Sequence, residues 1–371
     1  MTLNMNYAKL IETTLKRIEP IDPRWIARAQ QRQLQLTKPP GSLGRLEEIA
    51  NRLAAIQQTL SPLVNQARIV LFAADHGVCA EGVNPYPQSV TAQMVSNFLR
   101  GGAAINALAR VADADLRIVD VGIASTITHP DGLIRRSIAL GTRNFCKEPA
   151  MSREQAVEAI CVGIEMGNDA VSEGCNLLGI GEMGIGNTTS ASALTAVLTG
   201  LPPAAVVGRG TGADDACMER KISAIERSLA LHKATKTNLH DTLEALAQLG
   251  GFEIAALCGI CLSGAANRCA VVVDGFIATV AATLAVRLNN NVGEYLIAAH
   301  CSTEPGHRPL LNAIGQRPLL DLQMRLGEGT GAALAIPIIR AAVEAFTRMA
   351  TFESAGVSEA GVSGADAGTS S

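Results

Sequence analysis

Residues 176–200, NLLGIGEMGIGNTTSASALTAVLTG, join a short apolar run to a glycine-rich loop and then to a helical segment. Other short apolar runs also end in glycine or a polar residue and precede helical segments: 68–75, 116–123, 204–210, 269–275 and 294–300. Strands that are apolar along their whole length are typical of parallel sheets with helices on both faces. The sequence therefore predicts an α/β fold built on a parallel sheet of about six strands.

The ends of the predicted strands carry candidate polar groups. In open α/β sheets, ligands bind at the edge formed by the carboxyl ends of the strands. We therefore expect one crevice, bordered by Asp75-His76, Asp120, Gly179–Gly186, Gly208–Gly212, Asp274 and His300-Cys301.

The composition is that of a chain with a large core. Of 371 residues, 48% are hydrophobic and 18% are charged, and the formal net charge is −3. No dense run of Lys and Arg indicates binding to nucleic acid or to a membrane surface. Nine cysteines scattered through predicted core segments favour reduced thiols. With no export signal evident at the start, we expect a soluble, cytoplasmic protein that acts on small molecules.

The pattern changes along the chain in a way that predicts domains. Residues 1–62 are helical in pattern without a strand candidate, and the segment 317–350 ends in a long apolar helix. We expect these two segments to form a small helical domain and residues 63–316 to form the large α/β domain. The small, polar segment 352–371 is expected to be a disordered tail.

The first glycine loop matches the pattern G-x-G-x-x-G at Gly179, Gly181 and Gly184. A dinucleotide site also needs an acidic residue at the end of the next strand, and the sequence has VVGRGTG there instead. Glycines at a helix start let backbone N–H groups approach an anion, and Asn187 and Thr188 add donors. The loop therefore predicts a phosphate site, with a simple strand-to-helix turn as the alternative. The second loop, 208–212, favours the phosphate site, and Lys221 on the following helix adds charge.

Two glutamates in glycine-rich surroundings are candidates for chemistry. Glu328 lies between two glycines in RLGEGTGAALAIPII, residues 325–339, where a dry pocket would raise its pKa toward that of a general base. The alternative is a first-turn glutamate that stabilises the following helix. Glu182 is placed to stabilise positive charge on a ribose carbon or to bind a sugar hydroxyl.

The histidines do not form a recognisable metal motif. No pair has the spacing of metal ligands, so we expect no metal site and no cofactor. The residues considered for such a site were His76, His300, His307, Asp75 and Asp120.

Several long motifs occur in a fixed order: KPPGSLGRLE, FAADHGV with EGVNPYPQSVT, GEMGIGNTT, GRGTG, HCSTEPGH and RLGEGTGAAL. Together they resemble the nicotinate-nucleotide:dimethylbenzimidazole phosphoribosyltransferases of cobalamin biosynthesis. The resemblance covers about residues 10–349, apart from the segment 129–150. It implies a Rossmann-like large domain, a small helical domain from both termini, and a homodimer.

The resemblance also implies a reaction. The 5-phosphoribosyl group would move from nicotinate mononucleotide to 5,6-dimethylbenzimidazole, giving nicotinate and α-ribazole 5′-phosphate with inversion at the anomeric carbon. A nicotinate that leaves from a pyridinium departs as a neutral ring nitrogen, so positioning and a base are needed more than a metal. The alternative from another class, an NAD-dependent oxidoreductase, rests on the G-x-G-x-x-G match.

By motif match, the resemblance assigns roles to individual residues. Glu328 would be the base that removes the benzimidazole proton. Glu182 stays the second catalytic candidate on its position in the loop alone. The residues expected to bind phosphate or nucleotide are Gly184, Ile185, Gly186, Asn187, Thr188, Gly210, Thr211, Gly212 and Lys221. The residues expected to line the base pocket are Gln88, Ser89, Met94, Leu326 and Gly327.

Overall fold

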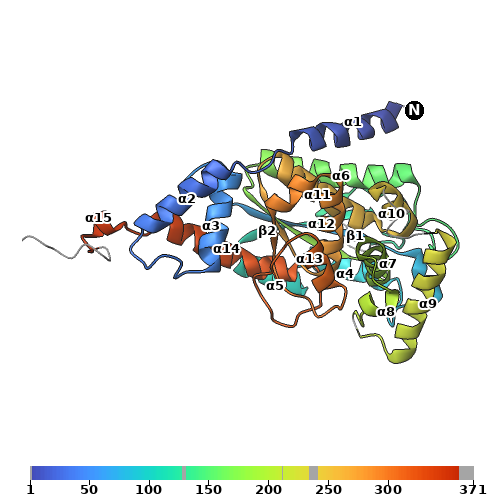
Figure 1. Ribbon diagram of the computed structural model, residues 1–371. Coiled ribbons are helices and arrows are strands. Elements are labelled where there is room, and N and C mark those ends of the chain that lie inside the picture. The colour runs from blue at the N-terminus through green and yellow to red at the C-terminus, as the bar shows by residue number, and fades with distance from the viewer. Residues whose placement is uncertain (1, 128–130, 211, 234–240, 359–371) are drawn as a thin grey trace, which may run out of the picture. The chain divides into compact units, whose positions relative to one another are not determined.

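The computed structural model describes residues 2–127, 131–210, 212–233 and 241–358. Its centre is a six-stranded sheet in which every neighbouring pair of strands is parallel. The strand order β3-β2-β1-β4-β5-β6 is that of a doubly wound Rossmann sheet, so the predicted α/β fold is confirmed (Figure 1). The strands are β1 (Ala67–Ala74), β2 (Ala114–Gly122), β3 (Leu133–Arg135), β4 (Leu177–Met183), β5 (Ala270–Val273) and β6 (Leu296–Ala298).

Helices cover the sheet on both sides. In Figure 1, α1, α6 and α11 lie above the sheet, and α4 and α5 lie below it. The α-helices are α1 (Thr2–Arg17), α2 (Pro23–Gln35), α3 (Arg45–Ile56), α4 (Val90–Leu99), α5 (Ala104–Val111), α6 (Arg153–Ser172), α7 (Asn187–Thr199), α8 (Pro203–Val206), α9 (Asp215–Leu231), α10 (Thr242–Leu249), α11 (Phe252–Ala266), α12 (Phe276–Leu288), α13 (His307–Ala313), α14 (Thr330–Arg348) and α15 (Phe352–Ala355). Two 3₁₀ helices are η1 (Gly77–Glu81) and η2 (Asn290–Tyr295).

The strand predicted at 204–210 is wrong, although the number of strands agrees. Pro203–Val206 forms the short helix α8, and the fixed φ of Pro203 in its first turn favours helix over strand. The sixth strand is β3, which is only three residues long and therefore gave no apolar run. The second glycine loop, 208–212, consequently follows a helix and not a strand.

The layer above the sheet depends on close contact between α6 and α11. A Cβ added at Gly163 would lie 1.9 Å from the backbone oxygen of Ala256, and one at Gly259 would lie 2.0 Å from that of Ile160. The two helices therefore pack backbone against backbone. Helix α11 is buried along its whole length and contacts β1, β2, β4 and β5. This contact fixes the helix that covers most of the sheet.

The described chain divides into two compact units. Residues 2–20 and 65–337 form the unit that contains the sheet, and residues 21–64 and 338–358 form the other. These boundaries differ from the predicted ones, since α1 and the segment 317–337 belong to the sheet-containing unit. Helix α1 packs along α6 and α11, whereas α2 packs against α3 in the smaller unit.

The C-terminal segment contains the long apolar helix that was predicted, α14. Among the described residues it is the one helix long and apolar enough to cross a membrane, but 56% of its apolar window is buried inside the protein. This burial is typical of a core helix. Helix α15 occupies the start of the segment predicted to be a disordered tail. The rest of that tail, 359–371, lies outside the described residues.

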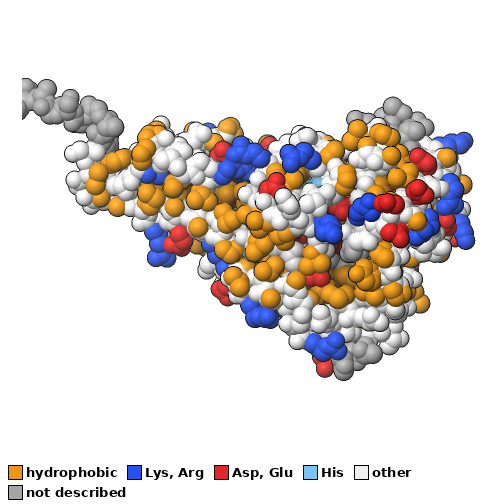
Figure 2. All heavy atoms as spheres, turned by 90° about the horizontal axis from the view of Figure 1, so that it is seen from below, with side chains coloured by type: hydrophobic (Ala, Val, Ile, Leu, Met, Phe, Trp, Pro, Cys, Tyr) orange, Lys and Arg blue, Asp and Glu red, His pale blue; other side chains and the backbone are white. Residues whose placement is uncertain are grey.

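On the face drawn in Figure 2, Lys and Arg side chains are interspersed with Asp and Glu, and hydrophobic side chains reach the surface in several places. No continuous basic stripe crosses this face.

The contact between α6 and α11 can be tested by adding one methyl group. We expect Gly259→Ala to lower the free energy of unfolding by about 3 kcal/mol, because the new Cβ would collide with backbone. The control is Gly293→Ala in the 3₁₀ helix η2, whose Cβ would meet no atom closer than Cγ2 of Val286 at 3.7 Å. Alanine also improves helix propensity by about 1 kcal/mol, so the control should stay within that range of wild type. Urea denaturation measures both variants, and equal losses would contradict the backbone-contact argument.

Candidate active site

A cavity of about 710 Å³ lies at the carboxyl ends of β4, β5 and β6. Gly184, Asp274 and His300, which follow these three strands, all line it. The strand order reverses between β1 and β4, and doubly wound sheets bind ligands beside such a reversal. A cavity of this volume is in the range of small-molecule sites. The expected crevice therefore exists, although Asp75, His76 and Asp120 do not line it.

Glu328 occupies a strained position in the pocket wall. Its φ of 64° is in the left-handed region, and Gly327 and Gly329 on either side have φ of 84° and 88°. A glutamate rarely adopts this conformation, and such strain is found most often where function requires it. A Cβ added at Gly181 would lie 2.4 Å from the backbone oxygen of Glu328. Strand β4 therefore needs glycine at this point to let the Glu328 backbone approach.

The carboxylate of Glu328 lies in a dry environment. Its side chain is buried, and Oε2 accepts a hydrogen bond from the backbone N–H of Ile105 at 3.4 Å. Burial raises the pKa of Glu328 to about 7, opposed by this hydrogen bond and assisted by the charge of Asp274. At neutral pH such a group is balanced between holding and accepting a proton, which suits a general base.

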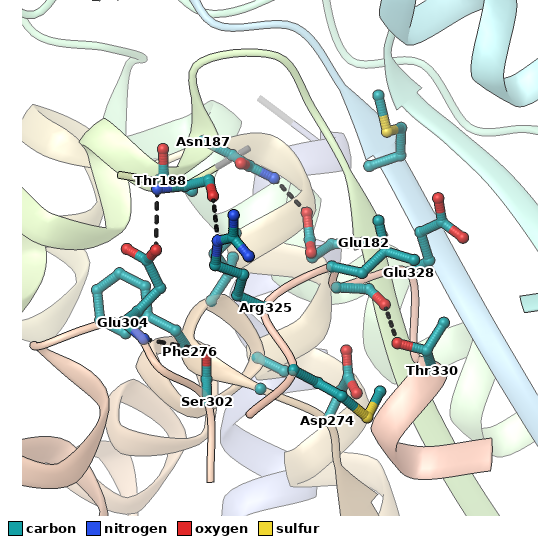
Figure 3. Close-up of a pocket in the computed structure, with 18 of the residues that line it drawn as sticks. Glu182, Asn187, Thr188, Asp274, Phe276, Ser302, Glu304, Arg325, Glu328 and Thr330 are labelled. Carbon is teal, nitrogen blue, oxygen red and sulfur yellow. Dashed lines mark hydrogen bonds between the residues drawn. The ribbon is translucent and has the colours of Figure 1, made fainter. Parts of the chain in front are cut away.

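Glu182, at the end of β4, lies on the same side of the pocket as Glu328 in Figure 3. Its carboxylate accepts a hydrogen bond from the side-chain amide of Asn187. Burial raises the pKa of Glu182 to about 8, with contributions from the charges of Glu253 and Asp274. A positively charged group bound nearby would favour the ionised form of this carboxylate.

The first glycine loop forms the next part of the wall. Gly184, Ile185, Asn187 and Thr188 line the pocket, and helix α7 begins at Asn187. Gly186 has φ of 95° and does not line the pocket, because it faces Cys79 behind the loop. The pocket therefore meets the N-terminus of α7, where backbone N–H groups favour an anion.

The second glycine loop is arranged differently from the prediction. Gly210 lines the pocket, but its N–H already donates to Oε1 of Glu304 at 2.9 Å, and its carbonyl accepts from Nε of Arg325 at 3.1 Å. Gly212 does not line the pocket, and Thr211 lies outside the described residues. Oε2 of Glu304 is buried and has no hydrogen-bond partner among the described residues.

Lys221 lies behind the pocket wall and not in it. Its side chain is 2% exposed, and Nζ donates to Oγ1 of Thr188 at 3.0 Å and to the carbonyl of Gly208 at 3.1 Å. Burial lowers the pKa of Lys221, opposed by the nearby charge of Glu304. Because Thr188 accepts this hydrogen bond, its own hydroxyl proton is available to the pocket.

The predicted base pocket is brought together only in part. Met94, Leu326 and Gly327 line the cavity, together with the apolar side chains of Val90 and Leu108. Two residues predicted there do not line it. Nε2 of Gln88 donates to the carbonyl of His76 at 3.4 Å, and Ser89 precedes α4 as its N-cap residue.

Several lining residues were not among the predicted site residues. Asp274 had been noted only as a strand end, and His300 as a strand end and among the residues considered for a metal site. Ser302, Glu304 and Arg325 lie inside motifs quoted from the sequence. The signal for these residues was their position after a buried strand or within a polar, glycine-containing motif. One sequence does not say which of these side chains turn toward the cavity.

His307, one of the histidines considered for a metal site, has a structural role. Nδ1 of His307 accepts the N–H of Ser302 at 2.8 Å, and its Nε2 lies 2.9 Å from Oγ1 of Thr279. Burial lowers the pKa of His307 to about 3, so the ring is neutral. Among the described residues, no group of three or more His, Cys, Asp or Glu side chains is arranged to hold a metal ion.

Comparisons with known proteins give a consistent result. The profile of a family described as phosphoribosyltransferase matches residues 18–357. The nicotinate-nucleotide–dimethylbenzimidazole phosphoribosyltransferase of Geobacter sp. (strain M21) is 52% identical over 349 residues, which cover 94% of this chain and 99% of that protein. The protein of the same name from Chloroflexus aggregans is 50% identical over 351 residues, covering 94% and 98%. A crystal structure of CobT from Thermus thermophilus has a TM-score of 0.86 and 49% identity, covering 91% and 99%.

These similarities do not support the alternative of an NAD-dependent oxidoreductase. The glycine pattern behind that alternative has a different physical reason. A Cβ at Gly179 would lie 2.9 Å from Cγ1 of Ile69, and Gly181 makes the close approach to Glu328. A Cβ at Gly184, the third glycine, would lie 2.5 Å from the carbonyl oxygen of Ala74, so close packing accounts for all three glycines of the pattern.

The raised pKa of Glu328 predicts a pH dependence of stability. The folded protein keeps a proton on Glu328 up to about pH 7, whereas the unfolded chain loses it near 4.5. The stability from this group is complete below the lower value and is lost as the pH rises through the higher one. Between pH 5 and pH 8 we expect the free energy of unfolding of Glu328→Gln to rise by about 1–2 kcal/mol relative to that of the wild type. Urea denaturation at both pH values measures this difference. The exposed control Glu226→Gln should show none, and an equal change in both variants would contradict the prediction.

Proposed function

The chain belongs to the nicotinate-nucleotide–dimethylbenzimidazole phosphoribosyltransferase family, and from this premise we propose how its pocket carries out the reaction. The enzyme transfers the 5-phosphoribosyl group of nicotinate mononucleotide to 5,6-dimethylbenzimidazole, for the lower nucleotide loop of cobalamin. Its products are nicotinate and α-ribazole 5′-phosphate. Its substrates are small molecules, in agreement with the size of the cavity.

We propose that Glu328 is the base that removes the ring N–H proton of the benzimidazole. The observation that carries this proposal is the buried carboxylate held by a left-handed backbone between two glycines. A pKa of about 7 lets the group accept a proton during the reaction without being protonated permanently. The apolar side chains of Met94 and Leu326 would hold the flat ring beside it.

Glu182 is proposed to face the sugar. As the bond to nicotinate breaks, positive charge moves from the pyridinium ring to the anomeric carbon of the ribose. A carboxylate close to that carbon stabilises the charge as it develops. The hydrogen bond from Asn187 fixes the orientation of this carboxylate, and the cationic substrate itself favours the ionised form.

The phosphate of nicotinate mononucleotide is proposed to bind at the N-terminus of α7. Gly184, Ile185 and Asn187 bring the loop backbone to the pocket, and the hydroxyl of Thr188 adds a donor. Lys221 supplies positive charge through its hydrogen bond to Thr188. Arg325, which lines the same cavity, is a further cation near the phosphate.

The remaining predicted residues are proposed to act around these groups. Gly186 shapes the turn before α7, and Gly210 and Gly212 flank a loop on the Glu304 side of the cavity. Gln88 and Ser89 would reach a bound base only after a change in the loop before α4. Thr211 lies outside the described residues.

We further propose a cytoplasmic homodimer. The support is the family resemblance together with several large apolar side chains exposed on the sheet-containing unit, among them Tyr86, Val111 and Leu322. Light scattering on the purified protein should then give twice the chain mass of 38.6 kDa. Substituting Val111 and Leu322 by serine tests whether these side chains lie in the interface. A mass of 38.6 kDa for the unmodified protein would rule the homodimer out.

Two variants separate the proposed base from the proposed phosphate site. With nicotinate mononucleotide and 5,6-dimethylbenzimidazole, we expect Glu328→Gln to lower kcat by about 10²–10⁴-fold and to leave the affinity for the nucleotide nearly unchanged. We expect Lys221→Ala to raise KM for the nucleotide more than it lowers kcat, because it removes charge behind Thr188. The amount of product formed over time, measured by mass spectrometry, gives the rates. Calorimetry gives the affinities for the nucleotide.

The same assay with a panel of benzimidazoles, phenols and adenine tests the reaction itself. Formation of the corresponding ribotides together with nicotinate is the expected result. A wild-type rate for Glu328→Gln would remove Glu328 from its role as base. Unchanged nucleotide affinity in Lys221→Ala would contradict the proposal that the phosphate binds at the N-terminus of α7.

A further inference from the structure

Asp274, the residue that follows β5, makes an unusual set of hydrogen bonds. Its Oδ2 accepts the backbone N–H of Gly329 at 3.1 Å, and its Oδ1 accepts those of Gly331 at 2.6 Å and Ala332 at 3.2 Å. The three donors lie within four residues after Glu328. Asp274 is 2% exposed and also lines the pocket.

This arrangement satisfies the first turn of α14 from outside the helix. The first N–H groups of a helix have no partner within it and normally receive one from the preceding residue. Here the preceding residues are Gly327, Glu328 and Gly329, all in the left-handed region, and the Glu328 carboxylate accepts the N–H of Ile105 instead. Asp274 takes that place from a neighbouring strand. Its hydrogen bonds therefore hold the strained turn in the conformation that directs Glu328 into the pocket.

We infer that Asp274 is a positioning residue for the phosphoribosyl transfer: it fixes the left-handed turn that directs the Glu328 carboxylate into the pocket. This inference rests on the proposed role of Glu328 as the base. Asp274 itself does not need to touch either substrate. Its effect on the reaction passes through Glu328.

The electrostatic part of the inference follows from the groups around Glu328. Among the described residues, Asp274 faces it from the end of β5, Glu182 from the end of β4, and the N–H of Ile105 from α5. Asp274 is in turn faced by His300, whose Nε2 lies 3.7 Å from Oδ1. A negative charge at Asp274 disfavours a second one at Glu328 and so raises its pKa. Removal of the charge would lower that pKa.

The test is the substitution Asp274→Asn, which removes the charge and places an amide N–H₂ against the N–H of Gly329. We expect kcat to fall by about 10²-fold, since a misplaced base loses most of its effect, while KM for nicotinate mononucleotide changes by less than about 3-fold. We also expect the acidic limb of the kcat/KM profile to move to lower pH by about half a unit or more. A purely structural cap would not move this limb.

The matched control is Asp120→Asn. Asp120 is another carboxylate near the end of a strand, and its Oδ1 accepts the N–H groups of Gly122 and Ile123, both at 2.9 Å. It does not line the pocket. Its substitution should change the melting temperature without moving the acidic limb.

Two further variants make every outcome decisive. Asp274→Ser removes the charge and, because its oxygen lies one bond nearer the backbone, also the hydrogen bonds to the turn, so it should lower kcat further than Asp274→Asn and show the same shift of the acidic limb. In a Glu328→Gln background, Asp274→Asn should cause no additional loss of kcat, because its effect passes through Glu328. Melting curves verify that each variant is folded.

The outcomes distinguish this inference from the proposal beneath it. If Glu328→Gln is inactive while Asp274→Asn retains the wild-type kcat and acidic limb, the inference about Asp274 is wrong. The proposal that Glu328 is the base then still holds. If Glu328→Gln retains wild-type activity, the assignment of the base fails first and the inference falls with it. Failure of both Asp274 variants to fold would limit Asp274 to a stabilising role and would also overturn the inference.

Discussion

The active site depends on one local constraint, the left-handed backbone of Glu328. Two flanking glycines permit this turn, Gly181 in β4 leaves room for its carbonyl, and Asp274 holds the helix that follows it. The glycines of the central strand are therefore explained by close packing, in one case by the approach of another backbone. A sequence pattern that resembles a dinucleotide fingerprint arises here from packing, on a sheet whose strand order is nevertheless that of dinucleotide-binding domains.

The charges of the pocket match a substrate that carries both signs. Glu182 and Glu328 lie on one side, where the cationic pyridinium ring and the anomeric carbon are proposed to bind (Figure 3). A second part of the pocket wall is formed by the N-terminus of α7, including Thr188, and Lys221 lies behind Thr188. The phosphate is proposed to bind there. Burial raises the pKa of both glutamates, and the like charges around them raise it further. A bound cation relieves part of this repulsion, so binding and ionisation support each other.

The sequence predicted the sheet and singled out two glutamates that line the cavity, but it did not predict the residues around them. Long apolar runs predicted five of the strands, but the run at 204–210 was a proline-initiated helix, and β3 was too short to be recognised. Glu328 was found because its glycine frame is visible in the sequence itself. Asp274 also follows a buried strand, but which strand-end carboxylates face a cavity depends on side-chain directions that appear only in three dimensions. For the same reason Gln88 was expected at the base and instead donates to the carbonyl of His76.

The raised pKa of Glu328 has a simple place in the charge balance of the proposed reaction. The nucleotide enters with one positive charge on its pyridinium ring, and nicotinate leaves with a neutral ring nitrogen. The benzimidazole enters neutral and becomes part of a neutral azole product, so its ring proton must go elsewhere. When Glu328 takes that proton, its carboxylate loses a negative charge at the step in which the pyridinium ring loses its positive one. A carboxylate with an ordinary pKa would hold the proton weakly, and its loss to solvent would leave the site more negative than before the reaction. A carboxylate with a pKa of about 7 keeps the proton, which compensates for the positive charge that the pyridinium ring loses.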